Sequence, residues 1–149
     1  MKNLIPMIII ILIGILIAVV DDFTRHRRLI RYWRRPCMGR DWRRSFPNAT
    51  KDDIRNFLNT FVDAFMLRNK NRLKFNPSDK LMDVYCLMYP PSSFCDALEL
   101  ETFALTIEEE YGVDLTESKD LEHITLGEIF EMTRNSNKGQ QGTSLARRP

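Results

Sequence analysis

The hydrophobic and polar positions divide the chain into an apolar beginning and a patterned remainder. No residue from Leu4 to Val20 is charged, and as a helix this run would be about 25 Å long at about 1.5 Å per residue. That length is at the short end of what a bilayer span requires. Because the residues before Asp21 are bulkier than a signal peptidase accepts, the pattern favours a retained helix over a cleaved secretory signal. It predicts a single transmembrane helix within residues 1–22.

Two later stretches have the spacing of amphipathic helices with recognisable ends. The first begins at Thr50, where Asp53 completes a capping-box-like start, and its apolar positions recur to about Leu67. The second has Asp96 as its predicted cap and ends at Gly112, the position where a left-handed residue is favoured. Both predictions rest on local pattern alone.

The remaining segments are less uniform. A third helix is predicted to begin at Thr125, with Glu128 in a second capping pattern. The apolar segment from Leu81 to Tyr89 has no decisive period, so a short helix and an extended segment both stay open. After Arg134 the residues are mostly polar or glycine, which predicts a disordered tail. The predicted regions are a transmembrane anchor (1–22), a basic and aromatic segment (23–46), a helical domain (47–134) and a disordered tail (135–149).

The formal net charge of +2 conceals two regions of opposite sign. Nine arginines and one acid lie between Phe23 and Phe46, whereas fourteen acids and two lysines lie between Asp79 and Met132. By the positive-inside rule, arginines directly after an apolar span place the rest of the chain in the cytoplasm.

The arginine-rich segment mixes cations with aromatic residues, a composition with three interpretations. Such a segment can lie on an anionic lipid surface, bind nucleic acid by phosphate neutralisation and stacking, or contact an acidic protein surface. Because the segment adjoins the apolar run, the sequence favours the lipid bilayer as its partner and disfavours nucleic acid. The predicted membrane-interface residues are Arg27, Arg28, Arg31, Trp33, Arg34 and Arg35.

The predicted second helix carries a longer motif. Residues 96–115 read DALELETFALTIEEEYGVDL, which resembles the second helix of acyl carrier proteins, where Asp-Ser-Leu opens an acidic helix. Ile124 to Ile129 is similar to the family's entry into its last helix. The resemblance covers about Lys51 to Thr133 and includes uncharacterised enterobacterial relatives with similar Asp-Ala openings. It implies an all-α fold, a small acyl-carrier-like helical bundle, and with the apolar run it predicts a single-pass protein of the bacterial inner membrane.

One position departs from the family pattern. Ala97 stands where acyl carrier proteins attach phosphopantetheine to a serine hydroxyl, and a methyl group forms no phosphodiester. No cofactor is therefore expected. What the resemblance still implies is an acidic surface for a protein partner with a basic patch, and the alternative is a solvated helix face. The predicted partner-binding residues are Glu99, Thr102, which replaces a usual acid, Glu108 and Glu109.

Other chemistry is disfavoured. The chain has no glycine-rich phosphate loop and no HExxH or GxSxG motif, and its three cysteines lack the CxxC spacing of a zinc site. We therefore expect the chain to have no metal site and no enzymatic activity. The leading hypothesis is a non-catalytic, membrane-anchored, acyl-carrier-like protein that recruits a partner through its acidic helix. The alternatives are a carrier modified at Ser92 or Ser93 and a membrane-bound nucleic-acid-binding protein.

Overall fold

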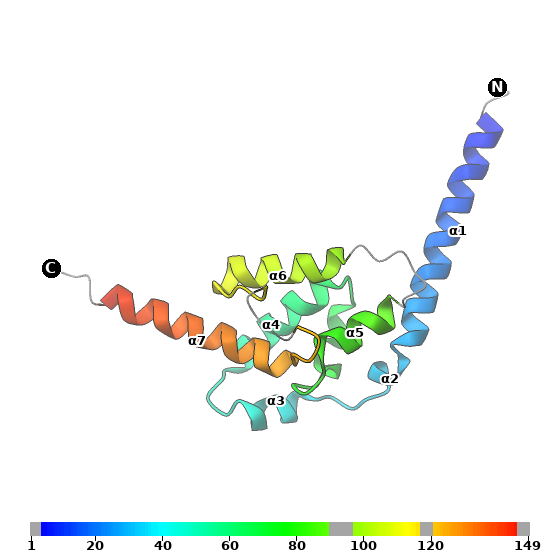
Figure 1. Cartoon of the computed structure of the whole chain (residues 1–149). Coiled ribbons are helices and arrows are strands. Elements are labelled where there is room, and N and C mark those ends of the chain that lie inside the picture. Colours follow the sequence, from blue (N-terminus) through cyan, green and yellow to red (C-terminus); the bar gives the residue numbers. More distant parts are fainter. Residues whose placement is uncertain (1–3, 90–96, 117–120, 146–149) are drawn as a thin grey trace.

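The computed structural model describes residues 4–89, 97–116 and 121–145. Within these ranges the structure contains helices and no strand, which confirms the all-α part of the prediction (Figure 1). The helices are α1 (Leu4–Arg28), α2 (Ile30–Trp33), α3 (Gly39–Ser45), α4 (Lys51–Ala64), the 3-10 helix η1 (Asn69–Lys74), α5 (Leu81–Met88), α6 (Leu98–Tyr111) and α7 (Leu126–Leu145).

Helix α4 begins where the sequence predicts. The Thr50 hydroxyl accepts a hydrogen bond from the Asp53 N–H at 3.1 Å, and the Asp53 carboxylate accepts one from the Thr50 N–H at 2.9 Å. This reciprocal capping box satisfies two backbone donors at the helix start. The helix ends at Ala64, earlier than the predicted end near Leu67, and Met66 then adopts a positive φ of 51° that turns the chain.

The apolar segment that sequence left open is helix α5, and it is tied to the start of α7. Lys80 and Thr125 form an isolated antiparallel bridge. The Leu126 N–H donates to the Asp79 carbonyl oxygen at 2.9 Å, and the Gly127 N–H donates to the Pro77 carbonyl oxygen at 2.8 Å. At Gly127 an added Cβ would lie 2.9 Å from that Pro77 oxygen, so this backbone contact requires a glycine.

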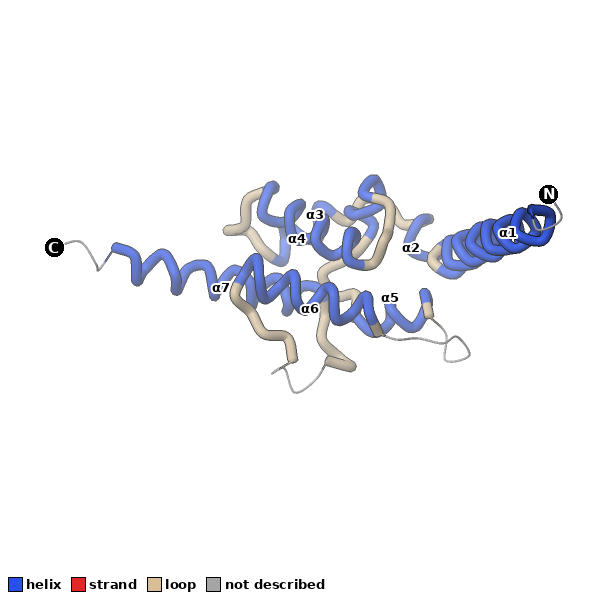
Figure 2. The backbone as a smooth tube through the Cα atoms, turned by 90° about the horizontal axis from the view of Figure 1, so that it is seen from above, coloured by secondary structure: helices blue, strands red, loops and turns tan. Residues whose placement is uncertain are grey.

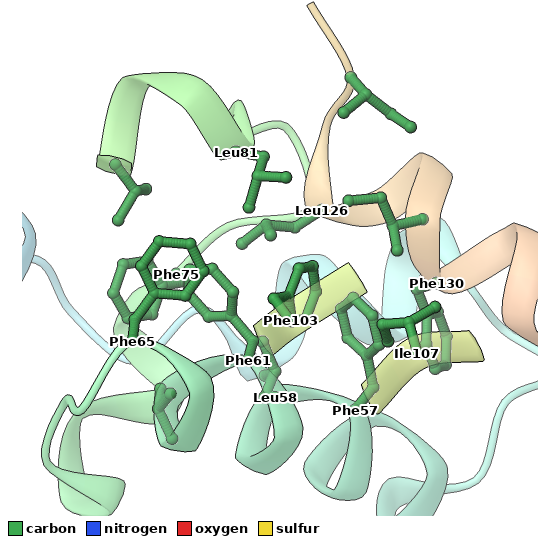
Figure 3. Packing of buried hydrophobic residues seen from close by; sticks show 14 of the residues in the cluster. Phe57, Leu58, Phe61, Phe65, Phe75, Leu81, Phe103, Ile107, Leu126 and Phe130 are labelled. Atoms are coloured by element: carbon green, nitrogen blue, oxygen red, sulfur yellow. The ribbon is translucent and has the colours of Figure 1, made fainter. Parts of the chain in front are cut away.

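The core lies between α4, α6 and α7, and it is rich in phenylalanine. Phe57 and Phe61 of α4 both pack against Phe103 of α6, with ring centroids 6.4 and 5.6 Å apart. Phe130 of α7 approaches Phe57 with centroids 5.3 Å apart. Figure 3 shows these side chains converging from the three helices. The aromatic pairs join elements distant in sequence, so they determine how the helices pack.

The core also includes residues before position 47, in the basic and aromatic segment. Leu29, Tyr32 and Trp42 are at most 1% exposed. The Trp42 indole N–H donates to the Phe75 carbonyl oxygen at 2.8 Å, and the Trp42 ring meets Phe130 edge-on at 5.6 Å. This segment is therefore packed into the helical domain and is not a separate linker.

Helix α1 extends away from the other helices and approaches them only at its C-terminal end (Figures 1 and 2). The described side chains between Met7 and Val20 are largely exposed and apolar. Among the described residues, no helix combines the length and the apolar character needed to cross a membrane. The uncharged run from Leu4 to Val20 is about 25 Å long at about 1.5 Å per residue, which is less than a hydrocarbon core of about 30 Å. The predicted transmembrane anchor and the single-pass inner-membrane location are therefore wrong.

Helix α7 begins with the predicted capping pattern and continues further than expected. The Glu128 carboxylate accepts from the Thr125 N–H at 2.8 Å, while the Thr125 hydroxyl accepts from the Glu128 N–H at 3.2 Å. The helix extends to Leu145, through part of the region whose composition predicts disorder. Because helix propagation adds one hydrogen bond per residue fixed, a start anchored in the core extends more readily than an isolated helix forms.

Candidate protein-binding site

The candidate site is the outer side of α6, whose inner side is fixed by burial. Phe103 and Ile107 are fully buried. At the C-terminal end, Gly112 has a left-handed φ of 66° and its N–H donates to the Glu108 carbonyl oxygen at 2.8 Å, as the sequence predicts. The helix is thus held in one orientation against α4, and its outward side chains occupy defined positions.

The beginning of α6 differs from the prediction. Ala97 is the N-cap residue, not Asp96, and it has the left-handed angles φ 56° and ψ 13° with no side-chain capping bond. An L-residue with a Cβ adopts this conformation at a cost of about 1–2 kcal/mol. Ser92, Ser93, Cys95 and Asp96 lie outside the described residues, so a carrier modified at Ser92 or Ser93 stays a prediction.

The structure does not bring the four predicted partner-binding residues together on one side of α6. Glu99 and Glu108 are separated by about two and a half turns at about 3.6 residues per turn, so they project to opposite sides of the helix. Glu99 is half-buried and accepts a hydrogen bond from the Tyr89 hydroxyl. Thr102 and Glu109 are exposed between these two sides.

The side that carries Glu108 also carries residues that the sequence analysis did not select. Glu101, Leu105 and Glu108 recur at intervals of four and three residues, which places them along one stripe of the helix. Leu105 is 58% exposed. Among the described residues, no cation lies within ion-pair distance of Glu101, Glu108 or Glu109. Helical spacing alone predicts this stripe from the sequence. The resemblance to acyl carrier proteins pointed instead to single positions of the family motif.

An apolar cavity of about 370 Å³ adjoins this stripe. Its apolar wall comes from α5, α6 and the segment that follows α6. Three acidic residues also line it, the exposed Glu101 and Glu108 and the half-buried Asp114, and these three form what we call its mouth. Asp114 is held in place by its own loop, because its carboxylate accepts from the Thr116 N–H at 2.7 Å and from the Thr116 hydroxyl at 2.6 Å. The volume falls in the range of about 300–1,000 Å³ typical of ligand pockets. The apolar lining residues are Leu81, Met82, Leu100, Phe103, Ala104, Leu105, Leu115 and Leu121.

The opposite side of α6 is occupied by contacts within the chain. Glu110 accepts a hydrogen bond from the Thr60 hydroxyl of α4 at 2.9 Å. The Thr106 hydroxyl donates to the Thr102 carbonyl oxygen at 2.8 Å. The burial of Tyr111 raises the pKa of its phenol, although a hydrogen bond with Thr60 lowers it. The side facing the cavity therefore offers more unpaired charge to a partner than the side facing α4.

Arg35, predicted to lie at a membrane interface, is part of the fold. Its Nη1 atom lies 2.8 and 2.7 Å from the two carboxylate oxygens of Asp79, and its guanidinium lies 4.4 Å from the centre of the Tyr32 ring. Asp79 also accepts a hydrogen bond from the Asn76 N–H at 2.6 Å. The Lys74 ammonium donates to the Arg35 carbonyl oxygen at 2.5 Å.

The other predicted interface residues differ in their surroundings. Arg28 donates to the Met88 carbonyl oxygen at 3.4 Å, and half-buried Trp33 packs edge-on to Phe75 at 5.8 Å. Arg27 lies over the Phe23 ring. Arg31 and Arg34 are exposed, and a role of these residues in lipid contact stays a prediction.

No group of histidine, cysteine or acidic side chains in the described parts of the chain is arranged to hold a metal ion. Cys37 and Cys86 are exposed free thiols. Comparison with protein-family models, with curated proteins and with solved structures found no match to the chain. The resemblance to acyl carrier proteins therefore stays a prediction from the sequence.

Proposed function

We propose that the chain is a non-catalytic binding protein that recruits a protein partner with a basic patch through helix α6, without a phosphopantetheine arm. The observation that supports this role most strongly is the row of unpaired carboxylates of Glu101, Glu108 and Glu109 on the outer side of a helix whose inner side is fully packed. A rigid helix presents its charges in a fixed geometry, so little ordering accompanies binding. Complementary charge also accelerates the encounter of two proteins and excludes wrong partners.

The side chain of Ala97 also supports a non-catalytic role. Its methyl group provides no nucleophile, and it lies at the start of the helix that carries the acidic row. Recruitment by surface charge needs no covalent attachment. Helix α6 can therefore bind a partner through its charges without an attached phosphopantetheine.

The test compares partner capture by the full chain and by two charge variants. In the first variant Glu101, Glu108 and Glu109 become lysine. In the control, the exposed acids Asp52, Asp63 and Glu131 on α4 and α7 become lysine, which gives the same change in net charge.

Proteins captured by the immobilised wild-type chain are identified by mass spectrometry, and circular dichroism checks that each variant keeps its helix content. We expect the α6 variant to lose at least tenfold in recovery of the main captured protein and the control to lose less than threefold. Equal losses in both variants would show that net charge alone drives capture, and equal recovery would remove the α6 carboxylates from the account.

A further inference from the structure

The acidic row and the apolar cavity share one edge of α6. Leu105 lies between Glu101 and Glu108 along the stripe and lines the cavity together with them. The two carboxylates are about 10.5 Å apart along the helix axis, at about 1.5 Å per residue. A cavity with an apolar wall and an acidic mouth favours an occupant with one apolar group and flanking positive charges.

We propose that this cavity receives an apolar side chain from a basic amphipathic helix of the partner, and that arginine or lysine on that helix pairs with Glu101 and Glu108. The inference rests on the recruitment role proposed above and names the element that α6 recognises. Two cations placed two turns apart on a partner helix match the axial spacing of the two carboxylates. An apolar residue of the partner helix that lies one turn from either cation is on the same side of that helix as the cations. This residue therefore faces Leu105.

The charge at the mouth disfavours other occupants of an apolar cavity. An anionic amphiphile would bring its head group toward Glu101, Glu108 and Asp114, where like charges repel. A wholly polar basic segment would leave the apolar wall in contact with water. Only an occupant with both features uses the wall and the mouth together.

The wall is partly exposed before binding, so its burial provides the affinity. Leu105 is 58% exposed and Leu121 is 39% exposed. Burying a leucine side chain of the partner against such a surface corresponds to about tenfold to a hundredfold in affinity. The carboxylates are exposed, so they contribute chiefly to orientation and to the rate of association.

The test uses synthetic helical peptides as probes and the full chain as receptor. The first peptide carries arginines two turns apart and one leucine between them on the same side. The second peptide has serine in place of the leucine, and the third has glutamates in place of the arginines. Fluorescence anisotropy measures the dissociation constant of each peptide.

Two receptor variants separate the cavity from the rest of α6. Leu105→Ser changes the cavity wall, while Leu98→Ser changes a leucine of nearly equal exposure, 56% against 58%, that does not line the cavity. Because both side chains are exposed, neither substitution opens a hole in the core. Thermal unfolding verifies that the two variants retain the wild-type fold.

We expect the leucine peptide to bind wild type at least tenfold more tightly than the serine peptide. Leu105→Ser should reduce this preference at least threefold, whereas Leu98→Ser should leave it unchanged. Equal affinity of the two peptides, or equal effects of the two substitutions, would overturn the cavity inference while leaving charge-based recruitment standing. Dodecanoate and the serine peptide are then compared as competitors of the bound leucine peptide. If dodecanoate displaces the leucine peptide at the lower concentration, the cavity is a lipid site instead. Loss of the recruitment role would appear separately, as partner capture unaffected by charge reversal on α6.

Discussion

The ion pair between Arg35 and Asp79 provides the sharpest test of the packing of the arginine-rich segment. Asp79 is 9% exposed and Arg35 is 31% exposed at their side chains. In Asp79→Ala, the guanidinium keeps its place over Tyr32 without its carboxylate, and the Asn76 N–H loses its acceptor. Removing one member of a buried pair typically destabilises a protein by about 3–5 kcal/mol, and partial exposure of Arg35 lowers our expectation to about 2–4 kcal/mol.

The assay is urea unfolding of the full chain, followed by circular dichroism and tryptophan fluorescence. A double-mutant cycle with Asp79→Ala, Arg35→Met and the double variant isolates the pairwise energy, which we expect to be about 1.5–3 kcal/mol. The control pair is Asp52 and Arg55, which lie 3.5 Å apart with side chains 82% and 48% exposed. An exposed pair of this kind contributes about 0.2–1 kcal/mol at most.

The reasoning fails if Asp79→Ala destabilises the protein by less than about 1 kcal/mol, or if the two pairs give equal coupling energies. Either result would mean that the ion pair between Arg35 and Asp79 does not hold the arginine-rich segment in the core. A large effect of Asp79→Ala without coupling to Arg35 would instead assign the energy to the turn capped at Asn76.

Two further predictions concern backbone packing and alkaline pH. Gly127→Ala should destabilise the protein by about 1–3 kcal/mol because the new Cβ would meet backbone atoms of Pro77 at 2.9 Å, whereas Gly14→Ala, with nothing within 4 Å, should not destabilise it; comparison of urea midpoints checks both. Burial raises the pKa of Tyr32 and of Tyr111 above 10.0, so the folded state keeps protons that the unfolded state loses. The contribution of the two protonated tyrosines to the free energy of unfolding should be fully present below about pH 10. It should be lost as the pH rises through the raised pKa values. Replacing both tyrosines with phenylalanine should flatten this decline, and an unchanged decline in unfolding midpoints between about pH 9 and 12 would contradict the assignment.

Features set by neighbouring residues were predictable from the sequence. Thr50 with Asp53, and Thr125 with Glu128, form the predicted capping boxes because each partner lies within one helical turn. Gly112 ends α6 because it adopts the left-handed conformation at little cost.

Features that depend on distant contacts could not be predicted in the same way. The arginine-rich segment mixes cations with aromatic residues, and this composition does not identify the partner of any one arginine. The partner of Arg35 is Asp79, far along the chain. The site shows the same division. The stripe of Glu101, Leu105 and Glu108 could have been found from helical spacing, whereas the cavity also requires α5 and the segment that follows α6 to pack against it.

The burial of Trp42 has a consequence for the order in which the fold is completed during synthesis. Its ring packs on Phe57 and Phe130, and its indole N–H binds the Phe75 carbonyl oxygen. A ribosome adds about 5–20 residues per second, so several seconds separate the synthesis of Trp42 from that of Phe130. During that interval Tyr32 and Trp42 have no complete core to enter. Trp42 therefore waits longer than Phe57 or Phe75 for the last helix that covers it.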